Sequence, residues 1–219
     1  MKNTPKEFGQ FLWQCYKGGP LGTRILQSLR PYICPFDLLL QTVPTNSTLL
    51  DIGSGSGGFV FLVNRFRGLN QGVGVDVNEE TISVARDAIK NLKKEEQKKL
   101  SFFTSEDEDS WSKKDFNVVS MIDVLHHVPP AQQDDFILKW YSHVSPGGLF
   151  IYKDMCTSPW YLELANRMHD LIFARQWVHH KRIKEVEDLL VKHNGVIVQK
   201  GSIRKLIYGH EYLIIQKKD

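Results

Sequence analysis

The chain has 219 residues, 42% of them hydrophobic, and 28 basic against 25 acidic side chains give it a net charge of +3. So small a charge gives no electrostatic reason to expect nucleic acid as a partner. No long apolar run and no apolar N-terminal segment is found, so we expect no membrane span or signal peptide and a cytoplasmic protein. The three cysteines (Cys15, Cys34 and Cys156) form neither a CxxC motif nor a disulfide framework, so no metal site is predicted.

Residues 1–44 predict an N-terminal helical cap. Apolar side chains recur at helical spacing in KEFGQFLWQCYKG, residues 6–18, and GTRILQSLRP, residues 22–31, is a second short helix candidate. From residue 45 onward, strands and helices alternate to the end of the chain. The predicted strands are 47–53, 71–78, 100–104, 116–124, 149–155, 196–205 and 208–218, and the predicted helices are 58–68, 79–99, 131–144, 158–177 and 182–195.

This alternation predicts a doubly wound, mostly parallel α/β sheet in which the last two strands pair as an antiparallel hairpin. We expect the helix 182–195 to end on Gly195 as its C-cap, and Pro129 and Pro130 to open the helix that follows them. Ligands of such sheets bind beyond the carboxyl ends of the strands. The loops after residues 51, 76, 104, 123 and 154 are therefore the places to look for chemistry.

The first of these loops lies in LLDIGSGSGGF, residues 49–59, whose glycines fit G-x-G-x-x-G. Glycines after a first strand allow a tight turn and a close approach to a ligand, and Asp76, at the end of the second strand, stands where a carboxylate can bind both hydroxyls of a ribose. These two features fit any adenosine-bearing cofactor, including NAD. Asp51 distinguishes between the cofactors, because its charge would repel a pyrophosphate by about 4 kcal/mol at contact. A cationic ligand would be attracted instead.

Four segments in this order, LLDIGSGSGGF, GVGVDVN, FNVVSMIDVLHHVPP and VSPGGLFIYKD, resemble the class I S-adenosylmethionine-dependent methyltransferases over residues 45–155. The resemblance implies a Rossmann-like, seven-stranded sheet with a terminal antiparallel hairpin, over residues 45–219. It also implies S-adenosylmethionine as the cofactor and a helical cap insertion at about 155–182, which together with residues 1–44 would cover the acceptor site.

Carried over by position, the resemblance assigns the cofactor contacts to three loops. Asp51, Gly53, Ser54 and Gly55 would line the methionine end of the cofactor. Asp76 would bind the ribose hydroxyls, and Val77 would lie against the adenine. One of Ser105, Glu106 and Asp107 would approach the adenine amine, with Glu106 aligning best, and Asp123 with Val124 would lie close to the transferable methyl group.

Three histidines are candidates for the catalytic base. His126 and His127 follow the fourth predicted strand, in DVLHHVP, a segment typical of family members that modify small molecules. One of them could remove a proton from the acceptor, and the alternative is that the pair only packs or caps the following helix. His169 lies on an otherwise apolar helical stripe and could face a substrate cavity or be a hydrogen-bonded core residue.

The acceptor is predicted to be a small, apolar or aromatic molecule, methylated on a hydroxyl oxygen or, next, on carbon. Aromatic residues in 155–182 favour this class, and ANRMHDLIFARQWVHH, residues 165–180, resembles methyltransferases of aryl-polyene and polyketide pathways. An RNA or protein methyltransferase is the alternative, based on the lysines at 90, 93, 94, 98 and 99, which a solvated helix end explains equally. An NAD-dependent oxidoreductase is a further alternative, against which Asp51 argues.

Overall fold

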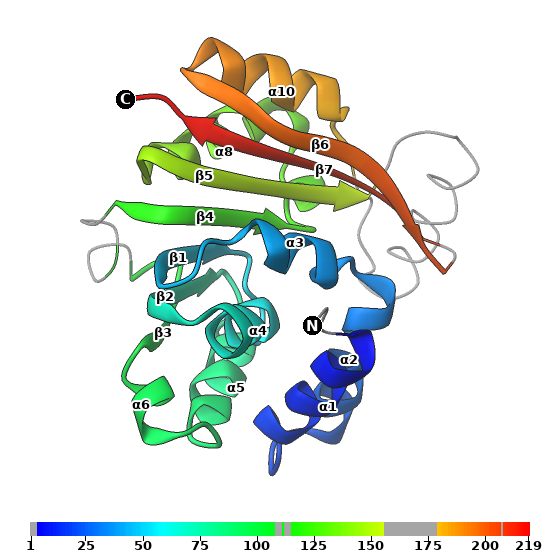
Figure 1. The fold of residues 1–219 in the computed structure, drawn as a ribbon. Helices are drawn as coiled ribbons and strands as arrows, with labels where there is room; N and C mark the ends of the chain where they lie inside the picture. The colour runs from blue at the N-terminus through cyan, green and yellow to red at the C-terminus, as the bar shows by residue number, and fades with distance from the viewer. Residues whose placement is uncertain (1–3, 108–110, 112–114, 156–178, 207) are drawn as a thin grey trace. The chain divides into compact units, whose positions relative to one another are not determined.

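The fold is that of a computed structural model, which describes residues 4–107, 111, 115–155, 179–206 and 208–219. Its seven strands form one mixed sheet in the order β3-β2-β1-β4-β5-β7-β6 (Figure 1). The strands are β1 Ser47–Ile52, β2 Leu69–Asp76, β3 Leu100–Thr104, β4 Phe116–Ile122, β5 Val144–Met155, β6 Gly195–Lys205 and β7 Tyr208–Lys217. β1, β2 and β3 pair in parallel, whereas β7 pairs antiparallel with both β5 and β6. The predicted Rossmann-like sheet with its terminal hairpin is thus confirmed.

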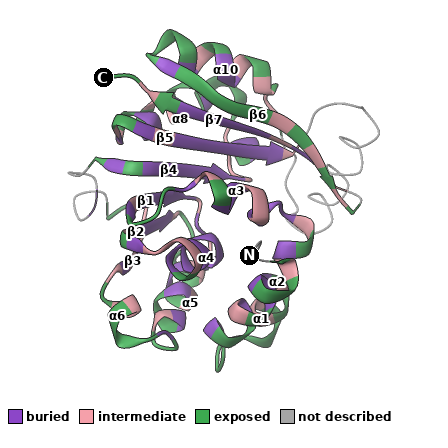
Figure 2. Cartoon of the chain, viewed as in Figure 1, coloured by how far each residue is buried: buried purple, intermediate pink, exposed green. Residues whose placement is uncertain are grey.

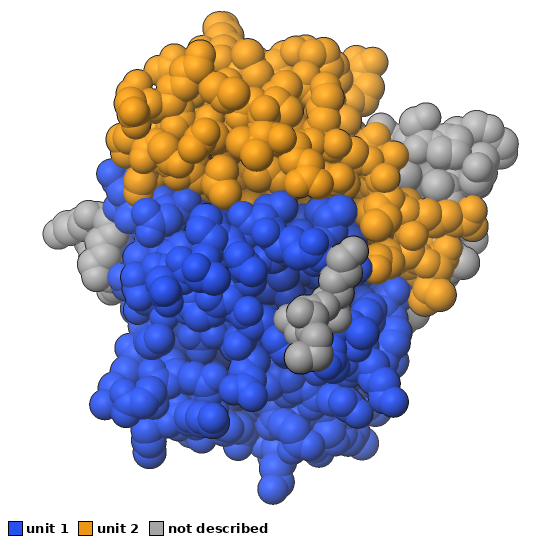
Figure 3. All heavy atoms as spheres, viewed as in Figure 1, with its two compact units in different colours: residues 1–118 blue, residues 119–219 orange. Residues whose placement is uncertain are grey.

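The chain divides into two compact units, residues 1–118 and 119–219, coloured separately in Figure 3. The helices of the first unit are α1 Pro5–Cys15, α2 Leu21–Ile33, α3 Phe36–Thr42, α4 Gly58–Arg67, α5 Glu79–Ile89 and α6 Lys94–Gln97. In this unit α4 packs against β1 and β2, while α5 packs against β2 and β3. No helix within the described part of the chain is long and apolar enough to span a bilayer.

The two N-terminal helices pack closely against each other. α1 begins with a capping box, in which the Thr4 hydroxyl accepts from the Glu7 amide and the Glu7 carboxylate accepts from the Thr4 amide. A Cβ atom at Gly9 would lie 2.5 Å from the carbonyl oxygen of Ser28 on α2, so a glycine is needed at this crossing. Both predicted N-terminal helices are present, and α3 is an additional helix that the sequence did not predict.

The prediction of one continuous helix over 79–99 was wrong, because α5 ends at Ile89 and α6 is a separate turn. The Asn91 side chain donates to the carbonyl oxygens of Cys15 and Lys17, which ties the residues after α5 to the end of α1. The Gln97 side chain donates to the carbonyl oxygens of Lys90 and Leu92. The Gln97 bonds satisfy two carbonyl groups that a continuing helix would have paired internally, and the Asn91 bonds hold the break against the end of α1.

The second unit carries its core on β5 and β7. Its helical elements are the 3₁₀ turns η1 Leu125–His127 and η2 Pro130–Gln132, and the helices α8 Gln133–Ser142 and α10 Ile183–Lys192. Residues 150–154 of β5 are buried, and β7 contributes Leu213, Ile214 and Ile215. β6 is exposed over most of its length (Figure 2).

Two local predictions in this unit need correction. Gly195 is not the C-cap of α10: His193 is the C-cap, Asn194 takes the left-handed conformation, and Gly195 is the first residue of β6. A Cβ atom at Gly195 would lie 2.7 Å from both the Leu190 carbonyl oxygen and an Ile215 methyl group, so close packing requires this glycine. The two prolines open a 3₁₀ turn, after which α8 starts at Gln133. The predicted helix 158–177, together with Cys156 and His169, lies outside the described residues.

Candidate functional site

The loop after β1 takes a path that only glycines accommodate well. Gly53, Gly55 and Gly57 all have positive φ, at 66°, 53° and 86°. A Cβ atom at Gly57 would lie 2.5 Å from the Phe102 ring, so the loop packs directly on that side chain. A Cβ atom at Gly55 would meet nothing within 4 Å, which means that the backbone at Gly55 borders open space. The loop thus presents accessible backbone at the carboxyl end of β1.

Two buried polar side chains lie at the start of this loop, Asp51 near the end of β1 and Ser54 in the loop itself. Asp51 is 3% exposed and Ser54 is 4% exposed. The Ser54 amide donates to the Val75 carbonyl oxygen, at 3.0 Å, whereas its buried hydroxyl oxygen has no hydrogen-bond partner among the described residues. A buried hydroxyl with no partner costs free energy, so Ser54 retains hydrogen-bonding capacity at this loop.

The Asp76 carboxylate at the end of β2 is bonded to the glycine loop. One oxygen accepts from the Gly55 amide at 2.7 Å, and the other accepts from the Asn78 amide at 2.9 Å. Val77, the next residue, is 84% exposed, which is unusual for a large apolar side chain. The predicted contacts of Asp76 with a ribose and of Val77 with an adenine stay predictions, and the exposed Val77 leaves an apolar surface for a ring.

Of the two acids predicted near the adenine, Asp107 is part of its own turn. Its carboxylate accepts from the Thr104 amide at 3.3 Å and from the Thr104 hydroxyl at 2.9 Å, and it lies 3.8 Å from the Arg86 guanidinium. Glu106 is exposed. The choice between these two acids for an adenine contact stays open.

Tyr16 is a contact to the glycine loop that the sequence reading missed. Its hydroxyl, at the end of α1, donates to the Ser56 carbonyl oxygen at 2.8 Å. The ring is 1% exposed, and burial is the main reason that the pKa of this hydroxyl is raised above its ordinary value. The bond fixes the loop from a helix 40 residues earlier in the chain, and no spacing rule could have found it.

In the second unit, Asp123 follows β4 in a strained conformation. Its φ is 58°, uncommon for a residue with a side chain. The Asp123 amide donates to the Lys153 carbonyl oxygen at 2.9 Å, and the Lys153 ammonium, fully buried, pairs with the Asp123 carboxylate. Val124 is half-buried beside it. The predicted proximity of Asp123 and Val124 to the methyl group stays a prediction.

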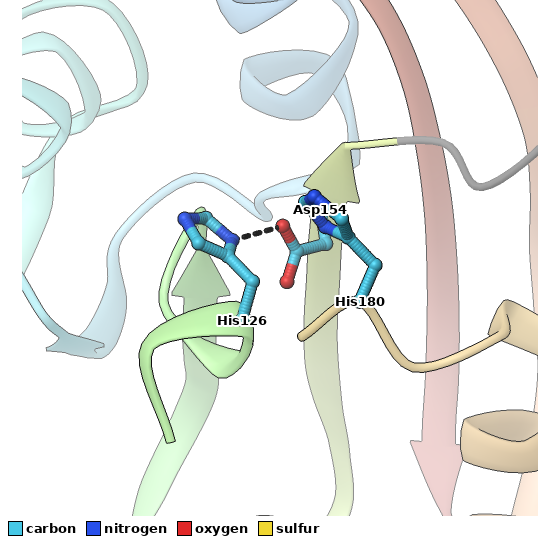
Figure 4. Close-up of side chains that lie close together, drawn as sticks. All are labelled: His126, Asp154 and His180. Atoms are coloured by element: carbon cyan, nitrogen blue, oxygen red, sulfur yellow. Dashed lines mark hydrogen bonds and ion pairs between the residues drawn. The ribbon is translucent and has the colours of Figure 1, made fainter. Parts of the chain in front are cut away.

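The two adjacent histidines differ in burial. His126 is 3% exposed, and its Nδ1 lies 2.5 Å from a carboxylate oxygen of Asp154, near the end of β5 (Figure 4). His127 is exposed, although its ring lies 4.1 Å from that of His126. The sequence reading left the two histidines equal, whereas burial distinguishes His126, which is paired with Asp154.

Asp154 was not among the predicted site residues. Burial by itself would raise the pKa of this carboxyl, but the charge of His126 and the hydrogen bond with it lower the pKa below its ordinary value. Asp154 is therefore a carboxylate at neutral pH. It also accepts from the Met155 amide at 2.8 Å and lies 3.4 Å from the Tyr152 hydroxyl. The sequence feature that could have identified Asp154 is the pair Lys153-Asp154, two charged residues at the end of an otherwise apolar strand.

The residues of the first unit fit S-adenosylmethionine better than a dinucleotide. No lysine or arginine occurs in residues 47–58 or 68–79, so the segments that form these loops carry no cation for a pyrophosphate. A buried carboxylate at Asp51 suits the ammonium group of the methionine end, and the unpartnered Ser54 hydroxyl and the open space at Gly55 leave polar contacts for a ligand.

The sheet and these loops define a class I S-adenosylmethionine-dependent methyltransferase. A family model described as a methyltransferase domain matches residues 27–200, and the chain belongs to that family. The predicted class of enzyme and its cofactor are thereby confirmed. A comparison with curated protein sequences gave no match.

Solved structures with the same fold are distant in sequence. A methyltransferase solved with the Trm112 methyltransferase activator of Haloferax volcanii has a TM-score of 0.70 at 15% identity, over 98% of this chain and 99% of that one. An O-methyltransferase family protein from Burkholderia thailandensis has a TM-score of 0.70 at 18% identity, over 98% and 72%. Magnesium protoporphyrin IX methyltransferase from Synechocystis, solved with bound S-adenosylhomocysteine, has a TM-score of 0.65 at 15% identity, over 97% and 96%.

Proposed function

We propose that this enzyme transfers a methyl group from S-adenosylmethionine to a hydroxyl oxygen of a small, apolar or aromatic acceptor, and that His126 is the general base. The observation that carries the proposal is the buried pair of His126 and Asp154, whose nitrogen and oxygen lie 2.5 Å apart. The O-methyltransferase family protein from Burkholderia thailandensis supports the oxygen class by analogy of fold.

The pair determines which nitrogen of His126 can act. A carboxylate at Nδ1 stabilises the tautomer with its proton on Nδ1, so Nε2 becomes the nitrogen that accepts a proton. Once Nε2 has taken that proton, the imidazolium is stabilised by the charge of Asp154. Two buried side chains, fixed by a short hydrogen bond, therefore form a pre-oriented base.

When bound, S-adenosylmethionine supplies an electrophilic methyl group on a sulfonium. In this proposal Nε2 of His126 would take the hydroxyl proton of the acceptor, whose oxygen would receive the methyl group that the bound cofactor supplies. Because the leaving group is good, alignment and proton removal are the main tasks of the protein. Asp51 and the glycine loop bind the cofactor in this proposal.

The test measures transfer of a labelled methyl group to a panel of phenols, hydroquinones and aliphatic alcohols. His126→Asn and Asp154→Asn should each lower kcat by about 10²–10⁴-fold, with the affinity for S-adenosylhomocysteine unchanged. Raising the pH should partly rescue His126→Asn with a phenol, because the ionised acceptor needs no base. The matched control is His193→Asn, which replaces an exposed histidine at the C-terminal end of α10.

Two results would contradict this function. If His127→Asn lowered kcat as much as His126→Asn, burial would no longer identify His126 as the base. Methylation of RNA or protein, with no hydroxyl compound accepted, would favour the alternative class. Binding of the cofactor is tested separately: S-adenosylhomocysteine at a hundred times its Kd should stabilise the fold by about 2.7 kcal/mol.

A further inference from the structure

A third side chain joins the pair of His126 and Asp154. His180 lies before α10, half-buried, and its ring centroid is 5.3 Å from that of His126 (Figure 4). One ligand atom from each of the three side chains can be chosen so that all lie within 4.8 Å of one another. We call these three residues the HDH cluster. A general base oriented by a carboxylate needs only two of them, so the position of His180 needs its own explanation.

The backbone beside His180 is tied to the segment that carries His126. The His179 amide donates to the His126 carbonyl oxygen at 3.1 Å. The buried side-chain amide of Gln133 lies 2.9 Å from the His179 carbonyl oxygen and 3.2 Å from that of Leu125, so one side chain bridges both segments. On the other side of His180, the Lys181 ammonium pairs with Asp134 at 2.9 Å. His180 is thus held next to the pair by bonds on both sides.

We propose that the HDH cluster is a binding site for a first-row divalent transition-metal ion such as Zn²⁺. Two imidazole nitrogens and one carboxylate oxygen are a ligand set that this class of ion prefers, and they leave further coordination positions for water. Ligands of a tetrahedral zinc ion lie about 3.4 Å apart, given bonds of about 2.1 Å. Small side-chain rotations would bring the ligand atoms to these distances. Mg²⁺ and Ca²⁺, which prefer all-oxygen sites, should not bind.

Metal binding would change the role of His126. The ring nitrogen that faces Asp154, and hence the cluster, is Nδ1. A metal at Nδ1 displaces the proton from that nitrogen to solvent, and the neutral ring then carries its single proton on Nε2. An imidazole in that state cannot accept a proton from a hydroxyl group. The metal should therefore inhibit methyl transfer, a consequence that rests on the proposed function, whereas metal binding itself does not.

The binding test uses the full-length protein after removal of metal with a chelator. We expect calorimetry to show one Zn²⁺ bound, with release of a proton that is measured by repeating the titration in buffers of different ionisation enthalpy. Co²⁺ should give visible absorption bands of a low-coordinate site with nitrogen ligands. His180→Asn should weaken Zn²⁺ binding by about tenfold or more, while His193→Asn, remote from the cluster, should bind as the wild type does. Thermal melts confirm that both variants are folded.

The activity test follows methyl transfer while Zn²⁺ is added. Zn²⁺ at ten times its Kd should lower the wild-type rate by about tenfold, and a chelator should restore it. The rate of His180→Asn, relative to its own zinc-free value, should fall much less at the same concentration. No uptake of Zn²⁺ by the folded wild type, or equal uptake by His180→Asn, would overturn the metal site. Zinc uptake without methyl transfer to any hydroxyl compound would refute the proposed function and leave the metal site standing.

Discussion

Removing one partner of the buried ion pair between Lys153 and Asp123 should strongly destabilise the second unit. The Lys153 side chain is 0% exposed and the Asp123 side chain is 18% exposed. Lys153→Met removes the ammonium group and leaves the charge of Asp123 largely out of water. Removing one partner of a buried pair costs about 3–5 kcal/mol, a large share of the roughly 5–15 kcal/mol that stabilises a typical domain. At about 2–4 °C per kcal/mol, Tm should fall by roughly 6–20 °C.

The reasoning is tested by a double-mutant cycle in urea, followed by circular dichroism at neutral pH. Asp123→Asn removes the second charge, and asparagine tolerates the left-handed backbone at this position. The double variant should therefore be more stable than the two single losses together predict, by about 1–3 kcal/mol. As a control, Lys192→Met replaces an exposed lysine at the end of α10, and its free energy of unfolding should stay within about 0.5 kcal/mol of the wild-type value. A loss below about 1 kcal/mol for Lys153→Met, or strictly additive losses, would refute the reasoning.

Two further predictions concern the first unit. Gly57→Ala should destabilise the protein by about 2–4 kcal/mol in urea denaturation, because it adds a Cβ atom 2.5 Å from Phe102 to a backbone with φ of 86°. The control is Gly22→Ala on α2, where the added Cβ atom meets open space and the change should be neutral or slightly stabilising. Equal effects of the two substitutions would contradict the close packing at Gly57. Burial raises the pKa of the Cys15 thiol from 9.0 to about 12. Between these two pH values the folded state keeps a proton that the unfolded chain loses, so the free energy of unfolding should fall as the pH rises from about 9 to 12. Cys15→Val should make that fall shallower, and an unchanged slope would contradict the assignment.

Most of the fold could be predicted from the sequence because it depends on local patterns. The predicted strands are short segments rich in apolar residues, except 196–205, which is largely polar after residue 198, and the order of motifs identified the family. The errors occurred where contacts between distant residues override local preference. The helix over 79–99 breaks where the Asn91 side chain bonds to the end of α1, and Gly195 is required by the packing of β6 against Ile215 of β7 rather than as the cap of α10.

The site was predicted unevenly for the same reason. The residues of the glycine loop and Asp76 follow their strands directly, so their positions could be read from the motif. Tyr16 and Asp154 could not be found in this way, because their partners are 40 and 28 residues away in the chain. His126 and His127 are neighbours of the same type, and only the packing of the folded chain buries one and exposes the other.

The sequence by itself determined the order of strands and helices, the glycine turn and the class of cofactor, since hydrophobic period, backbone freedom and the charge of Asp51 are properties of short segments. The tertiary structure decided which histidine is buried, paired it with Asp154 and brought His180 to the same place. Hydrogen bonds and burial between residues far apart in the chain depend on how the segments pack. The chemistry proposed for His126 therefore arises because η1, which follows β4, places His126 beside Asp154 at the end of β5, a relation that no single segment contains.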